Sequence, residues 1–130
     1  MKFEHTVRVY WEDTDAGGVV FYANYLKYFE RARTEWLRSL GFSQEKLRTQ
    51  DAAMFIVAST TVRYLRPARL DDALRVNVVV LEAGRATLAI AQQAHRGDEL
   101  VAEGDIRIGC VDAGTFRPRR IPTDLLTAIA

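Results

Sequence analysis

Two carboxylates, Asp13 and Asp15, are separated by one residue and stand just before a helical pattern. A carboxylate can act as a general base or as a nucleophile when the backbone fixes its position and an electrophile is held nearby. Asp15 follows a strand pattern and precedes small and apolar residues, so we expect it to be fixed and poorly solvated. The following helix start offers unpaired N–H groups and the positive end of the helix dipole. Such N–H groups can form an oxyanion hole for a reacting carbonyl.

On residue types alone, a structural interpretation of Asp13 and Asp15 is the more common one, because aspartates often precede helices as caps. We expect Asp13 to shape the loop or to pair with a cation. Gly17 and Gly18 are expected to bend the chain, so that Asp15 and the helix start face one carbonyl.

The elements around this stretch are a strand and a long helix. Residues 6–11 alternate between β-favouring and polar types, which predicts a strand. Apolar residues, Leu26 among them, recur at three- and four-residue steps over residues 22–40, which predicts one amphipathic helix. Asn24 is its expected N-cap, and Gly41 stands where a helix commonly ends.

The remaining sequence is rich in strand patterns joined by tight turns. Short turns imply an antiparallel sheet, and one amphipathic helix can bury its apolar stripe only against one face of it. We therefore predict a single α+β domain over residues 1–130, with about five strands and one long helix. Long unpaired strand edges invite another copy, so we expect a homodimer with a continuous sheet, and a dimer of dimers beyond it. The later elements are expected at 44–48 (a short helix capped by Ser43), 55–66, 74–81, 85–95, 100–111 and 124–129.

Composition excludes several classes of protein. Eighteen basic and seventeen acidic residues give a net charge of +1, which leaves no electrostatic footprint for nucleic acid. Cys110 is the only cysteine, so neither a disulfide framework nor Cys/His metal spacing is available, and a reducing compartment such as the cytoplasm fits. No apolar run approaches the ~20 residues that a membrane-spanning helix needs. We expect no metal and no separate cofactor.

Residues 8–25, together with residues 28–35, resemble the signature of hotdog-fold acyl-CoA thioesterases of the 4-hydroxybenzoyl-CoA thioesterase type. The resemblance is closest to the YbgC-like (Tol-Pal-associated) branch, which residues 67–72 also resemble. It spans about residues 6–120. It implies a hotdog fold, in which an antiparallel sheet wraps a long helix, and pairing into dimers that often form tetramers.

The resemblance also implies the roles of two residues. Asp15 matches the catalytic aspartate, which acts either as a nucleophile that forms an acyl anhydride or as a general base on water. Tyr22 matches the residue whose backbone N–H contacts the thioester carbonyl. Many close members carry histidine at this position, so any help from that ring is absent here. Coenzyme A enters as part of the substrate.

Further candidates line the expected acyl-CoA site. Ser59, Thr60 and Thr61 lie on the strand that, by resemblance, lines the cleft from the partner subunit, although a threonine-rich strand is also simply β-favouring. Arginine matches phosphate geometry, so Arg63, Arg66 and Arg85 are candidates for the phosphates of coenzyme A. The candidate substrate-binding residues are Gly17, Val20, Tyr25, Ser59, Thr60 and Thr61, whereas Phe29 and Trp36 are expected in the core.

The sequence thus predicts an acyl-CoA thioesterase that acts on a small-molecule acyl-CoA. An acyl carrier protein is a further candidate partner. The alternative is a hotdog protein that binds acyl-CoA or acyl carrier protein without hydrolysis, and retention of Asp15 argues against it. A hotdog dehydratase would need a histidine beside an acid, and neither His5 nor His95 is placed for that.

Overall fold

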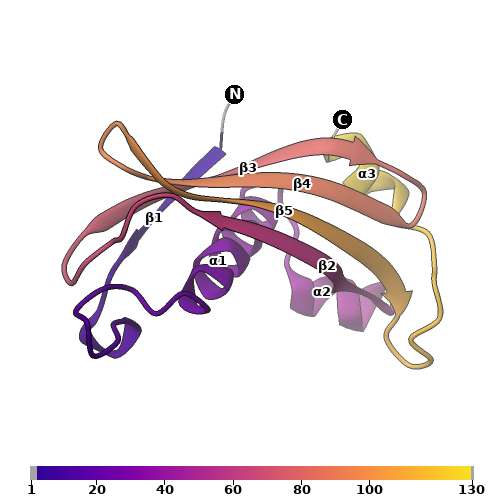
Figure 1. The fold of residues 1–130 in the computed structure, drawn as a ribbon. Coiled ribbons are helices and arrows are strands. Elements are labelled where there is room, and N and C mark those ends of the chain that lie inside the picture. Colours follow the sequence, from indigo (N-terminus) through magenta and orange to yellow (C-terminus); the bar gives the residue numbers. More distant parts are fainter. Residues whose placement is uncertain (1–2, 130) are drawn as a thin grey trace.

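The computed structural model of this protein describes residues 3–129, in which five strands form one antiparallel sheet. The strand order is β1-β3-β4-β5-β2, and α1 and α2 lie on the same side of the curved sheet (Figure 1). The expected α+β class and five-stranded sheet are confirmed, with strand ends shifted by a few residues. The elements are β1 (Phe3–Arg8), η1 (Trp11–Asp13), α1 (Asn24–Ser39), α2 (Gln44–Gln50), β2 (Ala53–Tyr64), β3 (Ala73–Ala83), β4 (Thr87–Arg96), β5 (Glu99–Asp112) and α3 (Thr123–Ile129).

The core forms where the apolar stripe of α1 packs on one face of the sheet. Phe29 is fully buried and Trp36 is 8% exposed, as expected. Tyr25 rather than Leu26 begins the stripe, because Tyr25 continues the i, i+3, i+4 series of the buried helix residues while Leu26 points to solvent. The approach is close at Gly104 of β5, where an added Cβ would lie 3.0 Å from the Phe29 ring.

The ends of the helices follow local rules with one exception. Gly41 has φ +89° after α1, and the N–H groups of Gly41 and Phe42 return to carbonyls of the last turn, which forms a Schellman motif. Ser43 caps α2 by accepting the Lys46 N–H at 3.1 Å. Asn24 is not the N-cap of α1 as expected. It is the first residue of the helix, and its side chain instead donates to the Asp13 carbonyl at 2.8 Å.

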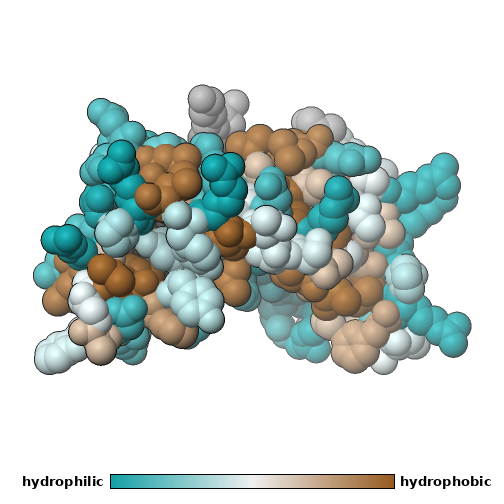
Figure 2. Space-filling model, viewed as in Figure 1, coloured by the Kyte–Doolittle hydropathy of each residue, from teal (hydrophilic) through white to brown (hydrophobic). Residues whose placement is uncertain are grey.

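Strand β2 forms an open edge of the sheet. It pairs with β5 alone, with a bulge between Val57 and Ser59, and the side chains of residues 56–61 are all exposed. On the face seen in Figure 2, apolar surface reaches solvent in several patches between polar side chains. The long unpaired edge predicted from the sequence is therefore present. Within residues 3–129 no helix combines the length and apolar character needed to cross a membrane.

Candidate active site

Asp15 lies on a tight turn that connects two short paired segments. Thr14 pairs with Val20, the Asp15 N–H donates to the Val19 carbonyl at 2.9 Å, and the Gly18 N–H donates to the Asp15 carbonyl at 3.0 Å. Gly18 has φ +79°, a conformation that side chains disfavour. The backbone position of Asp15 is thus fixed, as expected.

The carboxylate of Asp15 approaches the backbone closely at Gly17. Its Oδ1 accepts the Gly17 N–H at 2.8 Å, and a Cβ added at Gly17 would lie 3.2 Å from that oxygen. The lack of a side chain at Gly17 therefore allows the Asp15 carboxylate to approach the backbone, whereas Gly18 provides the positive φ that the turn requires. The expected poor solvation of Asp15 is wrong for this chain, because the tip of the turn is exposed and its small neighbours cannot cover the carboxylate.

Asp13 has the opposite environment and shapes the loop. It is 6% exposed, its Oδ2 accepts the Tyr10 N–H at 2.9 Å, and its carbonyl accepts the Phe21 N–H at 2.9 Å besides the Asn24 side chain. The buried Tyr28 hydroxyl makes no hydrogen bond among residues 3–129. Burial, and then the neighbouring Asp13 carboxylate, raise the pKa of Tyr28. Asp13 therefore joins the Asp15 turn to the start of α1.

The backbone just before α1 presents open donors. The N–H groups of Tyr22 and Ala23 make no hydrogen bond within the described part of the chain. The Tyr22 carbonyl accepts the Tyr64 hydroxyl at 3.1 Å. The Tyr64 ring lies 6.1 Å from the Tyr22 ring and 5.5 Å from the Tyr25 ring. Sequence reasoning missed Tyr64, which is 42 residues from Tyr22 and reads only as the end of a strand.

These tyrosines border a cavity of about 260 Å³ next to the Asp15 turn. Val20 and Tyr25, two of the predicted substrate-binding residues, are in its wall. Burial raises the pKa of Tyr25, and a hydrogen bond to the Ala68 backbone offsets only part of this effect. The cavity is lined by Val19, Val20, Tyr22, Tyr25, Tyr64, Leu65, Arg66 and Pro67.

The predicted hydroxyl residues of β2 lie apart from this cavity in the same chain. Ser59, Thr60 and Thr61 are exposed and stand three to five residues before Tyr64. At about 3.3 Å per residue they are roughly 10–17 Å from Tyr64 along the strand. One chain therefore does not bring them to Asp15.

The three candidate phosphate-binding arginines divide between the two ends of the sheet. Arg66 lines the cavity and pairs with Glu99 at 3.5 Å, and Arg63 pairs with Glu103 at 2.9 Å. Arg85 lies near Cys110, because the Cys110 N–H donates to the Ala86 carbonyl at 2.8 Å. Cys110 and Glu103 are about seven residues apart on β5, or roughly 23 Å. One chain therefore does not form a single site from all three arginines.

Arg85 instead has the basic tail as its neighbour, which sequence reasoning did not place. The Ile121 N–H donates to the Arg85 carbonyl at 2.8 Å, and the Arg119 N–H donates to the Cys110 carbonyl at 3.1 Å. The backbone of residues 119–121 thus runs beside Arg85. The only signal in the sequence was the basic composition of residues 117–120.

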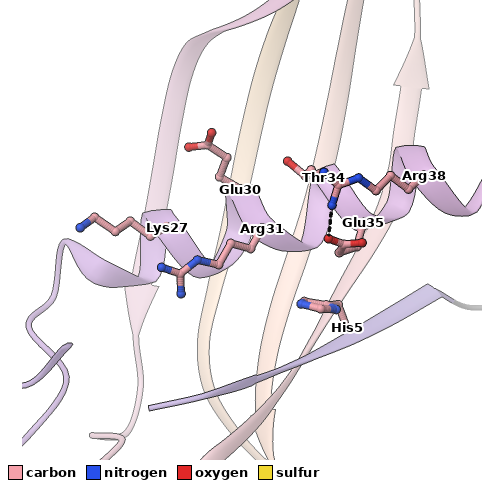
Figure 3. Close-up of a pocket in the computed structure, with 7 residues that line it drawn as sticks. All are labelled: His5, Lys27, Glu30, Arg31, Thr34, Glu35 and Arg38. Atoms are coloured by element: carbon pink, nitrogen blue, oxygen red, sulfur yellow. Dashed lines mark hydrogen bonds and ion pairs between the residues drawn. The ribbon is translucent and has the colours of Figure 1, made fainter. Parts of the chain in front are cut away.

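A second cavity, of about 390 Å³, lies between the outer face of α1 and β1 (Figure 3). Arg38 and Glu35, one turn apart on α1, form an ion pair at its edge at 2.6 Å, and His5 extends toward it from β1. Its charges are mixed, and it contains no residue of the Asp15 turn. Residues 3–129 contain no cluster of three or more His, Cys, Asp or Glu side chains that could hold a metal ion.

A fixed carboxylate in the loop that leads to open N–H groups at a helix start, with that helix packed against an antiparallel sheet, is the arrangement expected of a hotdog thioesterase. Residues 9–129 match the family described as the thioesterase-like superfamily. The chain belongs to this family and is a hotdog-fold thioester hydrolase.

Two relatives and one solved structure are similar to this chain over nearly its whole length. The acyl-CoA thioesterase YbgC of Haemophilus influenzae is 41% identical over 126 residues, which cover 97% of this chain and 93% of that protein. The acyl-CoA thioester hydrolase YbgC of Escherichia coli O6:H1 is 41% identical over 125 residues, which cover 95% and 92%. The crystal structure of a probable thioesterase from Bartonella henselae superimposes with a TM-score of 0.90 at 30% identity, covering 94% of this chain and 100% of that one.

Proposed function

We propose that this protein hydrolyses an acyl-CoA to a carboxylic acid and free coenzyme A. The observation that carries the proposal is the Asp15 turn, which is held by backbone hydrogen bonds in the same loop as the open N–H groups of Tyr22 and Ala23. The full-length similarity to YbgC thioesterases supports the substrate class. A protein that only binds acyl-CoA would have no need of a carboxylate held in this way.

Asp15 takes one of two roles in this reaction. As a nucleophile, it attacks the thioester carbonyl and expels the coenzyme A thiolate, and water then hydrolyses the acyl anhydride. As a general base, it takes a proton from water, which attacks the same carbonyl and expels the coenzyme A thiolate, and that thiolate then takes up the proton. Oδ1 is occupied by the Gly17 N–H, whereas Oδ2 makes no hydrogen bond among residues 3–129, so Oδ2 is the reacting oxygen in either case. The Tyr22 N–H donates to the carbonyl oxygen as negative charge develops on it.

Two copies joined along β2 would complete the substrate site. Antiparallel pairing about a two-fold axis places the Ala53 end of one β2 beside the Tyr64 end of the other. Arg85 lies at the Ala53 end, so the arginine of a second copy would approach the cavity that Arg66 borders in the first. Ser59, Thr60 and Thr61 would then lie at the junction between the copies. We place this enzyme in the cytoplasm, supported by its single, unpaired and buried Cys110.

The test is Asp15→Asn, assayed by thiol release across short, long and aromatic acyl-CoAs. The asparagine oxygen can still accept the Gly17 N–H, so the turn is retained while the reacting oxygen is lost. General acid–base groups contribute about 10²–10⁴-fold, and we expect a loss of kcat in that range. Asp98→Asn, at an exposed hairpin position outside the site, is the matched control and keeps full activity.

Two results of the thiol-release assay would contradict parts of this proposal. Near wild-type turnover of Asp15→Asn on the best substrate would remove Asp15 from the mechanism. Tight acyl-CoA binding by the wild type, with no hydrolysis across the panel, would support a binding module instead. A single turnover in H₂¹⁸O tests the nucleophile role, because ¹⁸O found in the Asp15 carboxylate by mass spectrometry identifies an acyl anhydride that water opens at the aspartyl carbon.

A further inference from the structure

The hydroxyl of Tyr64 contacts the peptide group between Tyr22 and Ala23, which lies just before the first residue of α1. It donates to the Tyr22 carbonyl at 3.1 Å from the last residue of β2. The Tyr22 carbonyl and the Ala23 N–H belong to the same peptide group. That N–H has no partner among residues 3–129, whereas the next one, of Asn24, donates to the Phe21 carbonyl at 2.8 Å. Tyr64 therefore acts on a peptide whose donor is still available.

A hydrogen bond to a carbonyl has two effects on its peptide group. It fixes the orientation of the peptide plane, and it polarises the group so that the N–H becomes a better donor. Ala23 already has helical dihedral angles, with φ −70° and ψ −19°. The first N–H groups of a helix have no partner within the helix and together form a ready anion site. The Ala23 N–H is thus suited to the same negative charge as the Tyr22 N–H.

We propose that Tyr64 is a positioning residue for the reaction, which orients the Ala23 N–H as a second oxyanion donor beside the Tyr22 N–H. The proposal rests on the thioesterase function proposed above. Tyr64 keeps its proton throughout, and the oxygen of the tetrahedral intermediate only accepts hydrogen bonds. Tyr64 also ends the edge strand β2, so the strand that would pair with a second copy holds the oxyanion donors in place.

The ring of Tyr64 packs against its neighbours independently of the hydroxyl. It meets the Tyr22 ring edge-on and the Tyr25 ring at a tilt, and the side chain is 47% exposed. Tyr64→Phe therefore keeps these ring contacts and opens no buried cavity. A loss of stability alone would not account for a loss of rate in this variant.

The experiment measures kcat, KM and Tm for Tyr64→Phe on the best acyl-CoA substrate. Removing an oxyanion donor outright costs about 10²–10³-fold, so a donor that is present but less well oriented should cost about tenfold in kcat. We expect KM to change less than about threefold, since ground-state binding is retained. Tyr10→Phe is the matched control, because Tyr10 is 60% exposed and its hydroxyl makes no hydrogen bond within the described chain.

A spectroscopic measurement reports on the peptide group directly. In Tyr64→Phe we expect the Tyr22 ¹³C′ and Ala23 ¹⁵N resonances to shift, while Tyr10→Phe leaves both in place. An unchanged kcat, or a higher KM at unchanged kcat, would overturn the role of Tyr64. If Asp15→Asn is inactive while Tyr64→Phe keeps full kcat, only this inference fails. If the wild type hydrolyses no acyl-CoA, the proposed function fails first.

Discussion

The sheet has two contrasting halves: a completed half under α1, where the apolar side chains are buried, and an open half around β2, whose edge is exposed. Under α1, Gln92 is fully buried and yet bonded throughout: its oxygen accepts from Arg33 at 2.9 Å, and its nitrogen donates to the carbonyls of Phe29 and Asn77. Along β2, by contrast, Ile56 is 42% and Val57 is 50% exposed. The exposed apolar side chains and the unpaired edge of β2 lead us to expect an interface there.

The candidate active site lies in the open half. Asp15 is exposed, and the Tyr22 and Tyr64 side chains are 63% and 47% exposed, so a single chain exposes the reacting groups to water. Excluding water strengthens the electrostatic interactions on which an oxyanion hole depends. The two halves therefore differ in what a second copy would add: we expect it to change little under α1 and to shield the reacting groups from water around β2.

The largest expected effect comes from a substitution in the open half that blocks strand pairing at the edge of β2. Val57→Lys places a cation on the edge of β2, where two copies would bring it close to its own counterpart, and edge lysines are a known block to strand pairing. We expect sedimentation to show monomers, and thiol release at low protein concentration to fall about 100-fold. Thr6→Lys, at an exposed position of the opposite edge strand β1, is the control that keeps both the assembly and the activity.

Two results would contradict this view of the edges. A Val57→Lys variant that stays dimeric and active would show that β2 is not the interface. Loss of assembly in Thr6→Lys alone would move the interface to β1.

In the completed half, a core substitution should change the free energy of unfolding. Gly104→Ala adds a Cβ 3.0 Å from the Phe29 ring and 3.3 Å from Ile106, both fully or nearly fully buried. Overpacking of this kind costs about 1–3 kcal/mol, which a urea unfolding curve measures. Gly109→Ala on the same strand is the control, since nothing lies within 4 Å of its added Cβ. Equal stability of the two variants would mean that Phe29 moves aside freely.

Most of the fold was predictable because it is local. Alternating burial along β4 and β5 and the three-to-four-residue period of α1 reflect how side chains leave a strand or a helix. Gly41 and Ser43 terminate and start helices through bonds within a few residues. The residues that determine these features lie within or next to them in the sequence, so the features can be predicted from it.

The site was predictable only in part, because its contacts join distant segments. Asp13 and Gly17 act within their own loop, and their roles follow from position. Tyr64 reaches Tyr22 only because the end of β2 lies beside the α1 start, which depends on strand order and curvature. The exposure of Asp15 depends on which surfaces one chain can cover, and no pattern of residue types expresses that.

The smallest expected effect lies at the boundary between the two halves, where Asp72 pairs with Arg96 of β4 at 2.9 Å. Burial alone would raise the pKa of Asp72, but hydrogen bonds from the Arg69 N–H and from Arg96, with the charges of both arginines, outweigh it and lower that pKa. Ionised Asp72 therefore stabilises the fold above its ordinary pKa of 3.8, and this contribution is lost as pH falls through the lowered value.

Asp72→Asn should thus lower the free energy of unfolding by about 1 kcal/mol at pH 7, as expected for a partly exposed ion pair. The difference from the wild type should shrink as pH falls below 3.8 and should vanish below the lowered pKa, where the folded wild-type carboxyl is also neutral. Urea unfolding between pH 2.5 and 7 checks this, with Asp98→Asn as the control. A difference that does not vary with pH would assign the contribution of Asp72 to hydrogen-bond geometry. Arg69, whose N–H donates to Asp72, also pairs with Val19 next to the Asp15 turn. A loss of kcat in Asp72→Asn without any loss of stability would therefore assign the Asp72–Arg96 ion pair to the open half.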